Sequence, residues 1–102
     1  MRHVKFKYVY QKIVDLKQNQ KTMAQWSLAA AMVKLAEEEA TLTRLHSNRE
    51  RCLEEIKERG AQSVTISELT SLQAYADYLE DQIRQKNQDV EHAQQNVRHS
   101  QS

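Results

Sequence analysis

The chain contains no proline and a single glycine, Gly60, in 102 residues. Glycine and proline mark most turns in globular proteins, because glycine tolerates unusual backbone angles and proline fixes its own. A chain with so few turn residues has few turns, and this length is enough for one domain. Charged residues make up 28% of the chain, while phenylalanine and tryptophan occur once each, so a thick core cannot form. We therefore expect an all-α protein with very few, long helices.

The second half of the chain carries an unbroken heptad pattern. Mostly apolar residues recur at alternating spacings of three and four, which is typical of a coiled-coil seam. These positions are Leu69, Leu72, Ala76, Leu79, Ile83, Lys86, Val90, Ala93 and Val97. Upstream, Thr65 and Glu68 have the spacing of a capping box, which marks a helix start. The pattern predicts a helix over about residues 66–99.

The first half shows the same spacing and predicts a helix over about residues 8–59. Its seam positions are Leu28, Ala31, Leu35, Glu38, Leu42, Leu45, Arg49, Cys52 and Ile56. An apolar stripe extends this seam N-terminally through Leu16 to Val9. Residues 4–10 alternate apolar and basic side chains, which is a strand signal. Because no second strand is predicted, we expect these residues to form a loosely ordered arm or a frayed first helical turn.

Residues 60–65 separate the two seams and predict a turn. Gly60 suits the left-handed position that closes many helices. A connection this short makes the two helices antiparallel neighbours. Two registers fit the spacings, with Cys52 opposite either Ala76 or Leu69, and the sequence does not choose between them. In either register Glu38 and Lys86 lie within about a heptad of each other, so that they can form an ion pair.

The two predicted helices differ in length, so the apolar stripe from Val9 to Met23 has no partner within the chain. Because no helix-stop signal precedes Ser102, we expect the natural chain to continue past this residue. The fold predicted for residues 1–102 is all-α, a two-helix antiparallel coiled-coil hairpin. Its N-terminal end is left available for another molecule.

The net charge of +1 is unevenly distributed along the chain. Residues 1–21 carry six bases against one acid, whereas from Ser67 onward six acids face three bases. A basic end can bind an acidic protein, nucleic acid or an anionic membrane surface. The strand motif of common RNA-binding domains is absent, so we favour an acidic protein and expect no nucleic-acid partner. No apolar run approaches the roughly 18 residues that span a bilayer.

No residues have the spacing of a catalytic or metal-binding group, so we expect neither enzyme activity nor a cofactor. His92 and His99 lie one heptad apart, whereas helical metal ligands lie three or four residues apart. Cys52 excludes an internal disulfide, fits a reducing compartment and lies on the seam as a small buried hydrophobe. Tyr75 and Tyr78 lie beside the seam, where they either cover its edge or anchor a partner.

Two stretches of the chain resemble the flagellar export FliJ family. The first is Phe6-x-Tyr8-x-Tyr10-Gln11-Lys12-Ile13-x-Asp15-Leu16-Lys17. The second comprises Gly60, Val64 and Leu69, followed by Leu72-Gln73-x-Tyr75-x-x-Tyr78-Leu79-x-x-x-Ile83. The resemblance implies a soluble, cytoplasmic component of the bacterial flagellar type III export apparatus, peripheral to the inner face of the cell membrane. It also implies a coiled coil like the central shaft of a rotary ATPase.

The same resemblance implies three partners: a hexameric export ATPase, a membrane protein of the export gate, and export chaperones. We expect the ATPase ring to bind a basic, apolar set of residues near the N-terminus, namely Lys12, Ile13, Leu16 and Lys17. We expect the export gate to bind a stripe on the second helix, namely Tyr75, Leu79, Gln82 and Lys86. Two alternatives stay open, a structural or tethering coiled coil and a binder of nucleic acid or membrane surfaces through the basic arm.

Overall fold

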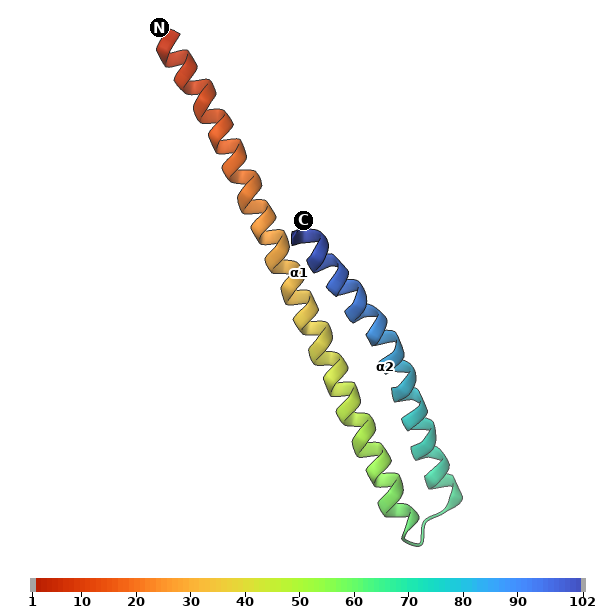
Figure 1. The fold of residues 1–102 in the computed structure, drawn as a ribbon. Coiled ribbons are helices and arrows are strands. Elements are labelled where there is room, and N and C mark those ends of the chain that lie inside the picture. Colours follow the sequence, from red (N-terminus) through yellow and green to blue (C-terminus); the bar gives the residue numbers. More distant parts are fainter. Residues whose placement is uncertain (1, 102) are drawn as a thin grey trace.

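The computed structural model describes the backbone of residues 2–101 and the side chains from residue 5 onward. It consists of α1 (Arg2–Gly60) and α2 (Ile66–Gln101), with no strand among the described residues. The two helices lie side by side and run antiparallel in a rod of 94 × 16 × 15 Å (Figure 1). The predicted all-α helical hairpin is confirmed.

Helix α1 begins at Arg2 rather than near Tyr8, so residues 4–10 are helical and the first alternative, a loosely ordered arm, is wrong. Alternating apolar and basic residues form a strand only where a second strand accepts their backbone hydrogen bonds. No strand lies among the described residues, whereas a helix satisfies these groups within itself. The helix that the heptads predict therefore continues N-terminally through residues 4–10 and begins at Arg2.

The turn closes α1 without the left-handed glycine that the sequence predicted. Gly60 is the last residue of α1 and does not have a positive φ angle. Instead, the Ala61 amide donates to the Glu58 carbonyl at 3.3 Å, and the Gln62 amide donates to the Arg59 carbonyl at 3.0 Å. These tight bonds use the last carbonyls of the helix while the chain keeps its right-handed winding.

Thr65 caps the start of α2, as the sequence predicted. Its hydroxyl accepts a hydrogen bond from the Glu68 amide at 3.2 Å, and its carbonyl accepts one from the Leu69 amide at 3.2 Å. The Glu68 carboxylate lies 3.9 Å from the guanidinium of Arg59, which joins the two sides of the turn. The cap satisfies amides that the first helical turn leaves without partners.

The core is a narrow seam between the helices. Its buried residues are Cys52, Ala76, Leu79, Ile83, Val90 and Ala93, together with the charged Glu38. Cys52, Ala76 and Leu79 form one cluster, against which Leu45, Leu53, Ile56 and Leu72 pack. The positions that the heptads predicted to face inward are all buried or half-buried. The seam assignment is therefore confirmed.

Two polar contacts join the helices along the seam. The Cys52 thiol donates to the Leu72 carbonyl at 3.3 Å, and the Lys86 ammonium donates to the Glu38 carboxylate at 3.1 Å. Cys52 also belongs to the buried cluster with Ala76 and Leu79, so its side chain lies among these residues of α2.

The sequence left two registers open, with Cys52 opposite Ala76 or opposite Leu69. The packing of Cys52 with Ala76 in one buried cluster agrees with the first of them.

Helix α1 is much longer than α2, with 59 residues against 36. At 1.5 Å per residue the difference is about 35 Å, and Figure 1 shows α1 continuing past the C-terminal end of α2. We call residues 2–27 the overhang. From residue 5 to residue 27 every side chain is exposed except that of Thr22, which is half-buried. Within the described residues, neither helix contains a stretch apolar enough to cross a membrane.

Candidate partner-binding surfaces

The overhang presents apolar side chains between lysines. Ile13 and Leu16 are 49% and 58% exposed, although both continue the stripe that is buried further along α1. At 100° per residue they lie about 60° apart around the helix, and Lys12 and Lys17 lie about 40° beyond them on either side. These four residues, which the sequence assigned to a partner, therefore share one surface that we call the basic face.

The neighbourhood of the basic face is positively charged. Asp15 is the single acid of residues 1–21, and its carboxylate accepts a hydrogen bond from the Gln11 amide at 2.9 Å. The Lys12 ammonium lies 5.5 Å from the centre of the Tyr8 ring, which is close enough for a cation–π interaction. An apolar strip between lysines suits a partner that is apolar in the centre and acidic at its edges.

Trp26 and Met23 extend the apolar exposure toward the paired part of the hairpin. Their side chains are 71% and 68% exposed. Large apolar side chains exposed in a row on a narrow rod are typical of interaction surfaces, because each loses water contacts when a partner covers it. The overhang therefore exposes apolar side chains from Phe6 to Leu16 and again at Met23 and Trp26, with the polar residues 17–22 between them.

The second predicted stripe does not form a single surface. Tyr75 is 49% exposed and Gln82 is half-buried, but Leu79 is 2% exposed and lies in the core cluster. Lys86 is half-buried and is held by carboxylates of both helices. The assignment of Leu79 as a contact residue is wrong because Leu79 and Lys86 are themselves seam positions. Tyr75 and Gln82, one heptad apart beside the seam, keep accessible side chains.

Tyr75 belongs to an aromatic pair on α2. Its ring stacks on Tyr78, which is 56% exposed, with centroids 6.3 Å apart and planes inclined by 23°. A shallow groove beside Tyr75 is lined from α1 by Asn48, Arg51 and Glu55. The sequence analysis singled out both tyrosines but missed the three α1 residues, because these residues follow no pattern in the sequence.

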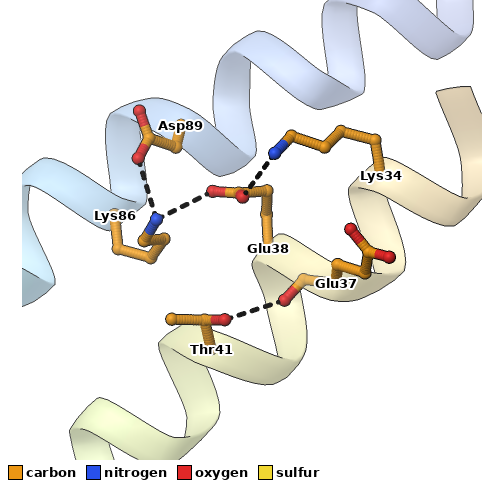
Figure 2. Close-up of polar contacts among 6 residues, drawn as sticks. All are labelled: Lys34, Glu37, Glu38, Thr41, Lys86 and Asp89. Atoms are coloured by element: carbon orange, nitrogen blue, oxygen red, sulfur yellow. Dashed lines mark hydrogen bonds and ion pairs between the residues drawn. The ribbon is translucent and has the colours of Figure 1, made fainter.

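A charged layer interrupts the apolar seam near its middle. Glu38 is 8% exposed, and its carboxylate lies 3.1 Å from the ammonium groups of both Lys34 and Lys86. Lys86 also lies 3.0 Å from the Asp89 carboxylate. Figure 2 shows the four side chains as a chain of alternating charge that crosses from α1 to α2. The predicted pairing of Glu38 with Lys86 agrees with this geometry.

These contacts shift two pKa values in opposite directions. Hydrogen bonds from Lys86 and then from Lys34 lower the pKa of the Glu38 carboxyl below its usual 4.5. Hydrogen bonds to Asp89 and then to Glu38 raise the pKa of the Lys86 ammonium above its usual 10.5. Both groups are therefore charged in the folded hairpin at neutral pH.

We expect acid to weaken the hairpin through Glu38. The folded state lowers the pKa of the Glu38 carboxyl. Its stabilising contribution is therefore complete above pH 4.5 and disappears as the pH falls through the pKa of the folded state. Urea unfolding from neutral pH to about pH 3 measures this loss. Glu38→Gln should be less stable than the wild type at neutral pH, and the difference should shrink in acid. A difference that does not change with pH would contradict this prediction.

The described residues contain no group of three or more histidine, cysteine, aspartate or glutamate side chains placed to hold a metal ion. The surfaces described above consist of exposed aromatic, aliphatic and charged side chains on a stiff rod. Comparison with protein families gave a match to the model described as "Flagellar FliJ protein", over residues 6–102. Comparisons with curated proteins and with solved structures gave no match.

Proposed function

The chain belongs to the FliJ family of flagellar proteins, and on this premise we propose that it works in the flagellar type III export apparatus. We propose that it acts as a central stalk that couples a hexameric export ATPase to the membrane export gate. The observation that carries the proposal is the overhang, a basic and apolar helical end on a rod 94 Å long. A function as a stalk requires a stiff body and separate contact surfaces, and it requires no catalytic residues.

The basic face supplies the contact with the ATPase ring. Lys12 and Lys17 would meet acidic loops around the ring lumen, while Ile13 and Leu16 would lie against apolar side chains between them. A single helix is about 10 Å wide and fits a narrow lumen more easily than the paired part of the hairpin. The complementary charges would also speed the encounter of the two proteins at low salt.

The tyrosine pair supplies the contact with the export gate. Tyr75 and Gln82 would touch the gate directly, and Tyr78 would widen the aromatic surface. Leu79 contributes from beneath by holding this face of α2 against α1. The gate would thereby keep the protein at the inner face of the cell membrane, while export chaperones would bind elsewhere on the rod.

Paired charge reversals and truncations test the two surfaces. Lys12→Glu with Lys17→Glu is expected to weaken binding to the purified ATPase hexamer about tenfold or more and to abolish ATPase stimulation, because two attractions become repulsions. Tyr75→Ala with Gln82→Ala is expected to weaken binding to the cytoplasmic domain of the gate and to leave ATPase stimulation intact. The measurements are affinity by titration calorimetry and the rate of ATP hydrolysis.

A matched control carries the same charge change elsewhere on α1. Arg44 and Lys57 are both exposed, and Arg44→Glu with Lys57→Glu should leave ATPase binding unchanged. If this control weakens binding as much as the change at Lys12 and Lys17, the attraction is a general effect of charge and the basic face is not a site. If neither pair affects ATPase or gate, a structural or tethering coiled coil becomes the better explanation.

A further inference from the structure

A shallow, mostly apolar groove lies next to the turn, at the end of the rod opposite the overhang. It is lined by Ile56 of α1 and by Ile66, Leu69, Ala74 and Asp77 of α2. Ile66 is 83% exposed, more than any other large hydrophobic side chain among the described residues. We call this feature the tip groove. It offers apolar surface that the packing of α1 against α2 does not cover.

The tip groove lies on the other side of the seam from Tyr75. At 100° per residue, Gln73 and Asp77 lie about 100° and 140° to one side of Leu72, whereas Tyr75 lies about 60° to the other side. The groove beside Tyr75 and the tip groove are therefore separate surfaces. The contacts proposed above for the ATPase ring and for the gate leave the tip groove unused.

The two ends of the rod carry opposite charge. The overhang, residues 2–27, contains six lysine or arginine residues and one acid. Residues 45–80, which form the end that carries the turn, contain seven acids and four lysine or arginine residues. Asp77 lines the tip groove, and Glu80 lies one turn further along the same side of α2. The rod therefore has a basic, apolar end and an acidic, apolar end.

The tip groove fits a helix that carries apolar side chains between lysines, and the overhang has this chemistry. Ile13 and Leu16 lie between Lys12 and Lys17 on the basic face, so that apolar groups would meet apolar groups and lysines would meet carboxylates. A chain cannot bring its own overhang to its own tip groove, because the two lie at opposite ends of a rod 94 Å long (Figure 1). The occupant that the chain itself supplies is a second copy.

Two copies lying side by side and antiparallel bring the two surfaces together. Helix α1 begins at Arg2 at one end of the rod, and α2 begins at Ile66 at the other. With the ends of the two rods level, residues 12–17 of one copy lie beside about residues 76–81 of the other. A two-fold axis then forms the same contact twice and leaves neither surface free. A parallel arrangement would instead place the two basic ends together, where they repel each other.

The exposed apolar side chains are numerous enough for such a dimer. A specific interface buries about 800 Å² on each partner, so the overhang and the tip groove of one copy would each contribute about 400 Å². Phe6 and Tyr10 precede Ile13 by seven and three residues and therefore share its side of the helix. Phe6 and Tyr10 are 74% and 61% exposed, and a fully covered aromatic side chain buries about 150–250 Å². Together with Ile13 and Leu16 they supply the area that the overhang must contribute.

We propose that two copies of the chain form an antiparallel dimer in which the basic face of each copy occupies the tip groove of the other. The dimer would cover the basic face and leave Tyr75 accessible. Self-association and binding of the ATPase ring would therefore exclude each other, which would make the dimer a resting form. The contact between the two copies does not itself depend on the function proposed above.

Sedimentation velocity of the purified chain measures the association. Between about 1 and 100 µM at low salt we expect the mass to double as the concentration rises, and we expect salt to weaken the association. Lys12→Glu with Lys17→Glu, and separately Asp77→Lys with Glu80→Lys, should each weaken it about tenfold or more, because each pair of changes sets like charges against each other. Circular dichroism verifies that both variants stay helical.

Mixing these two variants tests the pairing of the two surfaces. In a mixed dimer the altered overhang of one variant meets the altered groove of the other, and the second contact is wild type on both sides. The equimolar mixture should therefore dimerise again although neither variant does so alone. Arg44→Glu with Arg51→Glu is the control, because it changes the net charge as the Lys12 and Lys17 variant does. Arg51 lines the groove beside Tyr75, and Arg44 lies one heptad before it.

The control should dimerise like the wild type. If it loses the dimer as the Lys12 and Lys17 variant does, the attraction is a general effect of charge and the proposal is overturned. A wild-type chain that stays monomeric at about 100 µM and low salt would leave the overhang to a different molecule and would equally overturn it. A mixture of folded variants that stays monomeric has the same consequence, and so does growth into chains longer than a dimer. Because no ATPase is present, these outcomes are independent of the test of ring binding.

Discussion

Leu79→Asp is expected to abolish the cooperative thermal unfolding of the hairpin. Leu79 is 2% exposed and packs with Cys52 and Ala76 at the centre of the main core cluster. A carboxylate at this position would lose its water without finding a cation, and the leucine packing would be lost as well. Together these effects cost about 3–5 kcal/mol, which is a large part of the 5–15 kcal/mol that stabilises a typical domain. Circular dichroism during heating measures the loss.

The adjacent tyrosine gives the control. Tyr78 is 56% exposed, so Tyr78→Asp introduces the same charge on the same helical turn without burying it. We expect its unfolding free energy to change by less than about 1 kcal/mol. Equal melting curves for the two variants would mean that the apolar seam does not hold the helices together in solution.

The sequence predicted the hairpin because several independent signals agreed. Heptads on both sides of Gly60 required two helices, and the short connection required them to be antiparallel. The Thr65 cap fixed the start of α2, where its hydroxyl binds the Glu68 amide. Glu38 and Lys86 were expected to pair because each is a charged residue in an apolar seam, and such residues avoid burial without a partner.

The details that failed depend on contacts between the helices or at their ends. The start of α1 was misplaced because an alternating pattern looks the same whether or not a second strand is present. Leu79 was assigned both to the seam and to a partner surface, and its burial shows that the first role excludes the second. Spacing shows which residues share a stripe, whereas packing decides whether that stripe is covered.

The candidate surfaces were predictable in the same measure. The overhang follows from two helix lengths, and its lysines are visible in the sequence. The groove beside Tyr75 could not be predicted from the sequence, because its α1 side is formed by Asn48, Arg51 and Glu55. These residues have no pattern of their own and become neighbours of Tyr75 only through the packing of α1 against α2.

Ile13→Asp with Leu16→Asp is expected to abolish swimming of a flagellated host that depends on this protein, while leaving the hairpin folded. The change has the same chemistry as Leu79→Asp, but Ile13 and Leu16 are exposed and pack against no part of α2. The unfolding free energy should therefore change by less than about 0.5 kcal/mol. The apolar centre of the basic face would be replaced by charges that lose their water when an acidic partner approaches, so binding and motility should fail together.

Swimming in soft agar and thermal unfolding of the purified protein measure these two effects side by side. Met32→Asp with Val33→Asp is the matched control, because both residues are exposed, by 54% and 58%, on the part of α1 that α2 accompanies. It should leave swimming and stability close to wild type. If the control also stops swimming, exposed charge anywhere on α1 is harmful and the overhang has no special role. If the Ile13 and Leu16 variant swims normally, the overhang is not the surface through which this protein works, because the two residues at its apolar centre would be dispensable.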